Sequence, residues 1–384
     1  GHMWTAKMFG MKVRRYFIGF GPKIFSFRRG ETEYGLKVIP AGGFCDIAGL
    51  TALDEVTDDE LPRAMWRFAT WKRFVVMVSG SVTHFIIGFV ILYVMAVAMG
   101  LPNVSEKPVV GQVSACAQGQ NARTLDYLPC APGAPAPAKA AGLKPNDKII
   151  SINGTPTPTY QDVTKVVHPL HGPTSFVVQR DGKRKSLSVD IVDTPRVLNP
   201  HAVPGRDNKT AQVGTIGVGF QTYFHYGALS AVAGAGSFTG QMLVNAWQGL
   251  KLLPEKVPAL LHAIAGGHRD PNTPISVVGA SRIGGQAVQD GLWPVFWLLM
   301  ALLNFGVGVI NLLPLLPMDG GHVLVMLYER VRDGVRKLFG KAKGGPVDYT
   351  KLAPFTMVVI FIGGAYMLIA ITADIVNPLR LGGQ

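Results

Sequence analysis

The sequence predicts a polytopic α-helical membrane protein with a small β-rich domain inserted between its membrane segments. Of the 384 residues, 48% are apolar and only 16% are charged, which is typical of a membrane protein. Three apolar stretches, residues 74–100, 293–313 and 353–376, are each long enough to cross about 30 Å of hydrocarbon. Between the first two, residues 105–195 show short alternating segments and turn signals, which indicate strands.

The chain divides into four predicted parts. Residues 1–104 form the first part of the membrane core, with the end of a helix, a β-hairpin and the first span. Residues 105–195 form the inserted domain, and residues 196–292 form a linker with interfacial or re-entrant helices. Residues 293–384 form the second part of the membrane core.

The hairpin is expected in residues 16–39. Aromatic residues and β-formers precede and follow the turn composition Arg28-Arg29-Gly30-Glu31. Residues 40–44 (PAGGF) are expected to end the second strand.

The inserted domain carries local signals for its turns. Asn153-Gly154 and Asp181-Gly182 each predict a tight turn between two strands, and residues 161–167 suit a short helix. Farther along, segments 238–253 and 257–264 are too short or too polar for predicted spans, so they either lie in the interface or dip part-way into the bilayer.

The basic residues predict the orientation in the membrane. Residues 3–73 carry twelve Lys and Arg, and residues 317–352 carry seven. The positive-inside rule places both segments on the cytoplasmic side and residues 102–292 on the outer side of the cell membrane. The formal charge of +13 comes with no nucleic-acid-binding motif, so we expect no nucleic-acid partner. Outside the cytoplasm, Cys116 and Cys130 either form a disulfide or remain free thiols.

Asp319 is the strongest candidate for a functional residue. It follows the apolar stretch that begins near Trp293, at a depth where a charged side chain costs about 2.5–3.5 kcal/mol. Pro314 and Pro317 end the helix, and broken backbone at that depth is tolerated where it lines a wet cavity. Metal binding would stabilise the carboxylate there. The alternative is that Asp319 caps a helix beginning near Gly321.

With these features the chain resembles the site-2 protease family of intramembrane zinc metalloproteases, in its bacterial branch with one PDZ domain. The resemblance covers nearly the whole chain, and its most specific block is Asn-Leu-Leu-Pro followed by Asp-Gly-Gly. The family usually has Leu where this chain has Met318, an exchange that conserves volume. The matching segments are residues 1–2 (GH), 10–13 (GMKV), 39–44 (IPAGGF), 141–154, 274–279 (PISVVG) and 311–321.

The resemblance implies a zinc centre. In the family a His-Glu-x-x-His helix supplies two ligands and a Glu that activates water. Gly1 and His2 match the last two positions of this motif, so the first His and the general-base Glu are expected immediately upstream of residue 1. Gly-His-Met is also the remnant of a cleaved affinity tag, but Ala6 and Lys7 continue the family pattern. His2 and Asp319 would be two of the three protein ligands of Zn²⁺.

Other polar residues of the spans have two interpretations each. Asn311 either orients the substrate or its oxyanion, as the resemblance suggests, or only bonds neighbouring helices together with Asn304. His84 stands where the family commonly has Asn, and a packing role is favoured over a role beside the metal ligands. A ligand role for His322 is not favoured.

The resemblance implies an endopeptidase that cleaves single-span membrane proteins, such as anti-sigma factors, in regulated intramembrane proteolysis. The PDZ domain would exclude intact ectodomains and admit substrates already trimmed by another protease, or it would bind exposed C-termini. One alternative is a catalytically dead PDZ scaffold, because the Glu is absent from the given chain. Another is a PDZ-bearing transporter or channel subunit. The substrate, the trimming protease and the oligomeric state do not follow from the sequence.

Overall fold

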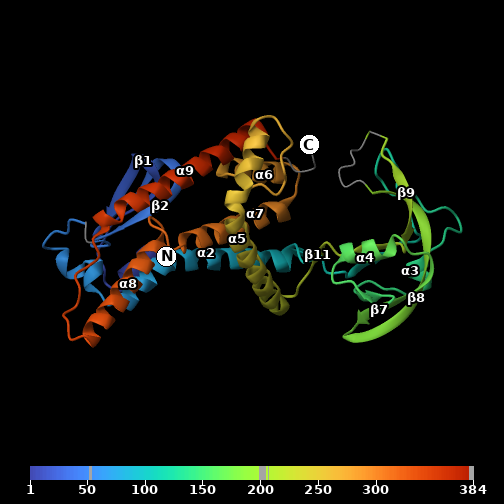
Figure 1. Ribbon diagram of the computed structural model, residues 1–384, viewed down its shortest axis with the longest axis horizontal. Coiled ribbons are helices and arrows are strands. Elements are labelled where there is room, and N and C mark those ends of the chain that lie inside the picture. The colour runs from blue at the N-terminus through green and yellow to red at the C-terminus, as the bar shows by residue number, and fades with distance from the viewer. Residues whose placement is uncertain (52–53, 199–204, 206, 380–384) are drawn as a thin grey trace. The chain divides into compact units, whose positions relative to one another are not determined.

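The computed structural model describes residues 1–51, 54–198, 205 and 207–379. The chain forms two compact units (Figure 1). Unit 1 combines residues 1–99 with residues 228–384, and unit 2 comprises residues 100–227. The predicted inserted domain, residues 105–195, lies within unit 2.

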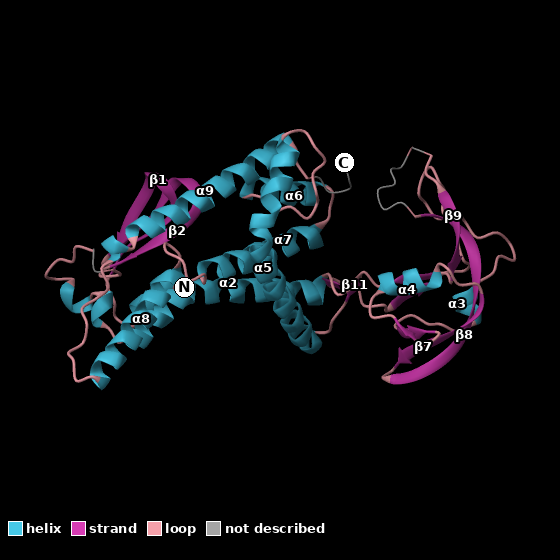
Figure 2. Cartoon of the chain, viewed as in Figure 1, coloured by secondary structure: helices cyan, strands magenta, loops and turns pink. Residues whose placement is uncertain are grey.

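Unit 1 consists of helices and one β-hairpin, as Figure 2 shows. Its helices are α1 (His2–Met8), α2 (Thr70–Ala98), α5 (Ala228–Ile264), α6 (Val277–Gln289), α7 (Trp293–Asn311), α8 (Asp319–Leu338) and α9 (Ala353–Val376).

Three of these helices confirm the three predicted apolar spans. Within the described part of the chain, α2, α7 and α9 are the helices long and apolar enough to cross a membrane. Glycine lets α2 and α7 cross closely. A Cβ at Gly88 would meet the Phe305 ring, and a Cβ at Gly308 would meet the Phe85 ring.

The two segments expected after the inserted domain are one helix in the structure. α5 runs unbroken through Pro254 and Pro258, whereas the sequence suggested separate pieces. Proline removes one backbone hydrogen bond, but α5 packs against α2, α7 and α9, and this packing keeps the helix continuous.

The predicted hairpin is confirmed and is longer than expected. Strands β1 (Val13–Arg29) and β2 (Thr32–Ile47) pair antiparallel around a turn at Gly30. The expected end of the second strand near residue 40 is wrong. Gly42 has a φ of +114°, and a Cβ at Gly43 would lie 2.7 Å from the carbonyl oxygen of Phe17. The glycines therefore permit bulged, close pairing instead of ending the strand.

Unit 2 is built on a five-stranded antiparallel sheet with the strand order β6-β5-β7-β8-β9. Two small pairs, β4 with β10 and β3 with β11, complete it. Its elements are β3 (Leu101–Pro102), β4 (Val110–Val113), α3 (Pro137–Ala140), β5 (Lys148–Ile152), β6 (Thr155–Pro156), α4 (Tyr160–Val167), β7 (Gly172–Arg180), β8 (Lys183–Val197), β9 (Thr210–Thr215), β10 (Val218–Phe220) and β11 (Tyr223–Phe224).

Local sequence signals are confirmed throughout this unit. Asn153-Gly154 and Asp181-Gly182 have positive φ at both residues and connect β5 to β6 and β7 to β8, as type I′ turns require. The helix expected at residues 161–167 is α4, whose start is closed by a capping box between Thr159 and Asp162.

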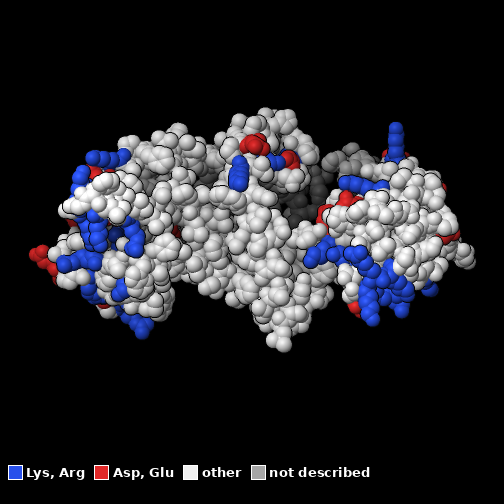
Figure 3. Space-filling view, turned by 60° about the horizontal axis from the view of Figure 1, so that its bottom comes forward, with Lys and Arg blue, Asp and Glu red and all other residues white. Residues whose placement is uncertain are grey.

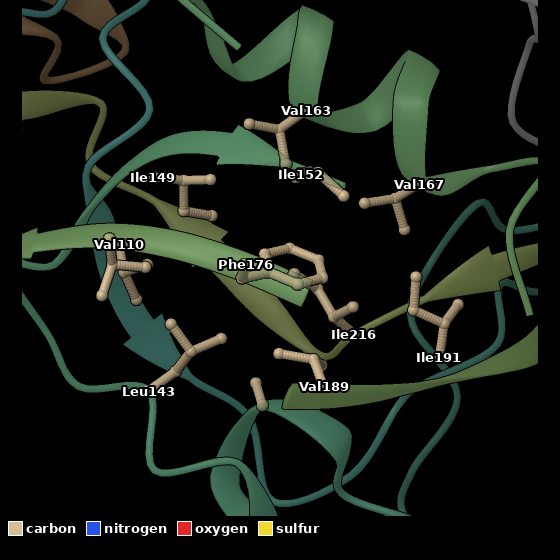
Figure 4. Close-up of a cluster of buried hydrophobic side chains, with 12 residues drawn as sticks. Val110, Leu143, Ile149, Ile152, Val163, Val167, Phe176, Val189, Ile191 and Ile216 are labelled. Carbon is tan, nitrogen blue, oxygen red and sulfur yellow. The ribbon is translucent and has the colours of Figure 1, made fainter. Parts of the chain in front are cut away.

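The core of unit 2 lies between its sheet and helices α3 and α4. Figure 4 shows the side chains of Ile152, Val163, Val167 and Phe176 directed into one cluster. Beside this core, the carboxylate of Asp147 is fully buried and lies 2.6 Å from Nε of Arg180.

The disulfide reading of the two outer cysteines is confirmed. Cys116 and Cys130 are joined, with a sequence separation of 14, while Cys45 is free and partly buried. The disulfide closes the loop of residues 117–129, and the Pro- and Ala-rich stretch of residues 131–137 follows it before α3.

Candidate metal centre

His2 and Asp319, the two residues proposed as metal ligands, lie together in the structure. Nε2 of His2 is 3.3 Å from Oδ2 of Asp319. His2 is the first residue of α1 and Asp319 is the first residue of α8. Asp319 does not cap its helix, because Met318 takes the N-cap position and no side-chain cap hydrogen bond forms there. The capping alternative is therefore wrong.

The position of His2 is fixed by close packing of α1 on α2. A Cβ at Gly80 would collide with the His2 imidazole, and a Cβ at Gly1 would collide with the backbone of Ser79. Oγ1 of Thr5 lies 3.0 Å from Oγ of Ser79. α1 can approach α2 this closely only because both contact positions are glycine.

A buried apolar cluster supports both ligand-bearing helices. It contains Ala6 of α1, Val76 of α2 and Met326 of α8, together with Met11 and Ile47 at the base of the hairpin. Three segments distant in the sequence therefore meet beside the pair, which limits how far His2 and Asp319 can separate.

The hydrogen bonding of His2 leaves one ring nitrogen free for a metal. Nδ1 of His2 lies 2.8 Å from the carbonyl oxygen of Val76. A carbonyl oxygen only accepts, so Nδ1 donates to it, and Nε2 is the ring nitrogen that faces Asp319. A backbone carbonyl bonded to the outer nitrogen is the usual support of a metal-binding His.

The separation of the two atoms fits a shared zinc ion. Ligand atoms about 2.0–2.2 Å from a tetrahedral zinc ion are roughly 3.3–3.5 Å apart. A direct charge-assisted hydrogen bond would be about 2.7–2.9 Å long. The observed 3.3 Å between Nε2 and Oδ2 agrees with the first arrangement. Within the described ranges no group of three or more His, Cys, Asp or Glu side chains could hold a metal, so the pair provides two ligands.

His84 and Asn304 pair with each other across the spans. Nδ1 of His84 lies 2.9 Å from Oδ1 of Asn304, and Nδ2 of Asn304 donates to the carbonyl oxygen of Met300. This contact between α2 and α7 supports the packing interpretation of both residues. Asn311 is the partly buried last residue of α7, and its role toward substrate stays a prediction.

The side chain of His322 pairs with Tyr349 rather than with His2 or Asp319. Its Nδ1 lies 3.2 Å from the hydroxyl of Tyr349, and the two rings stack with centroids 5.7 Å apart. Burial raises the pKa of Tyr349 to about 12, so the phenol keeps its proton beside His322. The bond ties the first turn of α8 to the segment that precedes α9.

Sequence reasoning missed three parts of this centre. The three small residues Ser79-Gly80-Ser81 within an apolar helix are a sequence signal for close approach of another helix. No sequence signal could reveal the carbonyl of Val76 or the hydroxyl of Tyr349, because both act through tertiary contacts.

Comparison with known proteins agrees with this geometry. Residues 1–345 match the family model described as Peptidase family M50. Zinc metalloprotease Rip1 of Mycobacterium bovis is 46% identical over 385 residues, which cover 99% of this chain and 94% of that protein. Rip1 of Mycolicibacterium smegmatis is 43% identical over 390 residues with the same coverage. Metalloprotease MmpA of Caulobacter vibrioides is 29% identical over 362 residues, covering 86% of this chain and 82% of that protein. Because the family match takes in most of the sequence and the Rip1 relatives align along nearly all of it, the chain belongs to peptidase family M50, the site-2 proteases.

Proposed function

We propose that this membrane protein is a zinc-dependent intramembrane endopeptidase whose metal is held by His2 and Asp319. The observation that carries the proposal is the 3.3 Å separation between Nε2 of His2 and Oδ2 of Asp319. Its family membership and its zinc metalloprotease relatives support the reaction class. The first His and the Glu of the His-Glu-x-x-His motif remain expectations.

Each residue of the centre then has a defined task. The Val76 carbonyl would hold a proton on Nδ1 of His2, so that Nε2 is the nitrogen directed to the metal. The Asp319 carboxylate contributes negative charge and a second ligand atom. Zinc bound there would lower the pKa of a water molecule to about 7 and polarise the scissile carbonyl. Asn311, at the end of α7, would hold the substrate backbone beside the pair.

The hairpin provides a surface for an unwound substrate. A helical substrate hides its scissile carbonyl in backbone hydrogen bonds, so hydrolysis requires an extended segment. The outer part of β1 and β2 exposes apolar side chains that suit an apolar strand added at the sheet edge. They are Ile18, Phe20, Ile24, Phe25, Phe27, Leu36, Val38 and Ile39.

Unit 2 would act as a PDZ domain that controls access. A cavity of about 370 Å³ lies between α4 and strands β9 and β10, lined by Val163, Val167 and Phe220 among other residues. A groove between a helix and a strand suits an extended peptide. Unit 2 would thus bind exposed C-termini, or exclude substrates with intact ectodomains.

The proposed substrates are single-span membrane proteins in the cell membrane, such as anti-sigma factors that an upstream protease has trimmed. The basic segments would face the cytoplasm together with the active site, and unit 2 would lie on the outer side. This reaction would place the protein in regulated intramembrane proteolysis.

Zinc analysis with a matched variant on the same helix tests the proposal. The protein is expressed from its own gene and purified from membranes, and its zinc content and its cleavage of a single-span reporter are measured. We expect Asp319→Asn to lose zinc and cleavage, since loss of a ligand weakens metal binding more than the roughly 10–100-fold caused by loss of a supporting residue. Asp333→Asn, on the same helix but bonded to Arg332, should retain both.

The alternatives give different results. A transporter or channel subunit would contain the same zinc in the Asp319→Asn and Asp333→Asn proteins. A dead scaffold would bind zinc in an Asp319-dependent way and leave the reporter intact. If His2→Ala keeps full zinc content, the assignment of the pair is wrong.

A further inference from the structure

Helix α8 carries an apolar stripe that no described residue of unit 1 covers. The stripe residues recur at intervals of three or four, so they lie on one face of the helix. Their exposed fractions range from 46% to 84%. An exposed apolar face of this extent marks an interaction surface. The stripe consists of Leu324, Leu327, Tyr328, Val331, Val335 and Leu338.

The opposite side of α8 is charged and partly bonded within the fold. Arg330, Arg332, Arg336 and Lys337 project from the other sectors of the helix. Met326, near this charged side, is buried in the cluster beside the metal pair. The stripe is therefore a second apolar face of α8, separate from the face through which Met326 packs into unit 1.

The position of α8 along the chain confines it to one membrane surface. α7 ends at Asn311 and α9 begins at Ala353, and both are candidate membrane spans. A helix in the connection between two crossings cannot move away from the surface at which they end. The connection that contains the stripe therefore starts and ends near the same membrane surface.

An ion pair fixes the depth of α8. Nη1 of Arg73 lies 3.7 Å from Oε2 of Glu329, and Arg73 belongs to the first turn of α2, where the apolar span begins. Trp66 and Trp71 near this turn are 43% and 58% exposed, as expected for an aromatic belt at the membrane interface. Glu329, midway along α8, is thus beside the first turn of α2, where we infer the membrane interface to lie.

The charge around α8 selects the kind of lipid. Residues 317–352 contain seven Lys and Arg against four Asp and Glu. Two of the carboxylates are bonded inside the fold, because Glu329 accepts from the backbone N–H of Val347 and Asp333 accepts from that of Gly344. In Figure 3, Lys and Arg gather at the end of unit 1 formed by α8 and the hairpin, next to a surface of the spans without charged residues. Net positive charge beside an apolar stripe favours an anionic headgroup layer.

We propose that α8 is an interfacial anchor whose apolar stripe inserts into a phospholipid leaflet with anionic headgroups. In this arrangement α8 crosses the membrane interface obliquely, with Glu329 beside Arg73 at the interface. Its basic residues lie among the headgroups. The helix begins at Asp319. Lipid contact along the stripe therefore restricts movement of the helix that bears this carboxylate. The proposal does not depend on whether Asp319 binds zinc.

Site-directed spin labels test this with a matched pair of neighbours. Val331 lies on the stripe, and Arg330, its neighbour in the same helical turn, is exposed on another side. Each is changed to Cys in the whole chain with Cys45→Ser, while the disulfide remains closed. The labelled proteins are reconstituted into phosphatidylcholine vesicles with and without phosphatidylglycerol. Collision rates are then measured with oxygen, which partitions into lipid, and with a water-soluble nickel chelate.

The expected result is a severalfold higher oxygen-to-nickel ratio for the Val331→Cys label than for the Arg330→Cys label. The difference should shrink without phosphatidylglycerol and at high salt. Equal nickel access at both positions would overturn the proposal. Spectral broadening at position 331 that disappears on dilution with unlabelled protein would also overturn it, because a second copy would then cover the stripe. If the label at position 331 is equally protected from the nickel chelate in vesicles without phosphatidylglycerol, anionic lipid has no role.

Discussion

A buried ion pair joins the end of α9 to the segment before α6, and removing half of it should strongly destabilise unit 1. Nη2 of Arg269 lies 2.6 Å from Oδ1 of Asp374, with side-chain exposures of 0% and 1%. The other oxygen of Asp374 accepts from the backbone N–H of Ser276. Arg269 also donates to the carbonyl oxygens of Asn377 and Pro274. The perturbation is Asp374→Ala.

The structure gives the size of the effect. Asp374→Ala removes the charged partner of Arg269 and the acceptor of the Ser276 N–H. The hydrogen bond that the Ser276 N–H donates to this carboxylate contributes about 1.5–3 kcal/mol. Loss of one partner from a buried ion pair costs about 3–5 kcal/mol. We expect a loss of about 3–5 kcal/mol, the range for breaking the buried pair. Replacing both partners, Arg269→Met with Asp374→Leu, should restore most of the stability, because apolar replacement of a whole pair is often neutral.

Reversible unfolding in mixed detergent micelles measures these differences. The control is Glu33→Ala, which removes the ion pair with Lys23 in the same unit, where the lysine is 54% exposed. This variant should unfold like the unmodified protein. The reasoning is refuted if Asp374→Ala also unfolds like the unmodified protein, or if the double variant is less stable than Asp374→Ala.

Three further predictions follow from the packing and charges described above. Gly80→Ala should displace the His2 imidazole and lower the zinc content, whereas Gly236→Ala, on an open helix surface, should leave it unchanged by metal analysis. Cys116→Ser should lower the unfolding free energy of unit 2 by about 3 kcal/mol, the chain-entropy value for a 15-residue loop, and reductant should have the same effect on the unmodified protein by thermal unfolding. Asp147 has a lowered pKa, because its hydrogen bonds to Arg180 and to the backbone outweigh the raising effect of burial. Its stabilisation is thus complete above the unfolded pKa of about 4 and is lost as pH falls through the folded pKa, and Asp147→Asn should flatten this acid dependence in circular dichroism melts.

The features predicted from sequence are those that depend on neighbouring residues alone. The three spans follow from the length of uninterrupted apolar stretches. The turns at Asn153-Gly154 and Asp181-Gly182 follow from the positive φ that glycine and its neighbour tolerate. In each case the local conformation needs no information from distant parts of the chain.

The features that could not be predicted depend on tertiary contacts. Proline at positions 254 and 258 suggested breaks in a helix that its neighbours keep continuous. Two glycines at residues 42–43 suggested the end of a strand, but they permit its close pairing. His2 and Asp319 were brought together by family resemblance, because no local rule links residues at opposite ends of the sequence. The Tyr349 hydroxyl on His322 had no local signal either.

The pairing of β3 with β11 has a consequence for how unit 2 can be gained or lost. Pro102 lies opposite Tyr223 and Leu101 opposite Phe224, so the outgoing and returning chain are about 5 Å apart. Deleting residues 103–222 and bridging the gap with Asn-Gly would turn this two-stranded neck into a simple hairpin. The order of the flanking membrane helices would be untouched. A domain whose first and last strands pair with each other can be exchanged in evolution, or in the laboratory, while the helices of unit 1 keep their order along the chain.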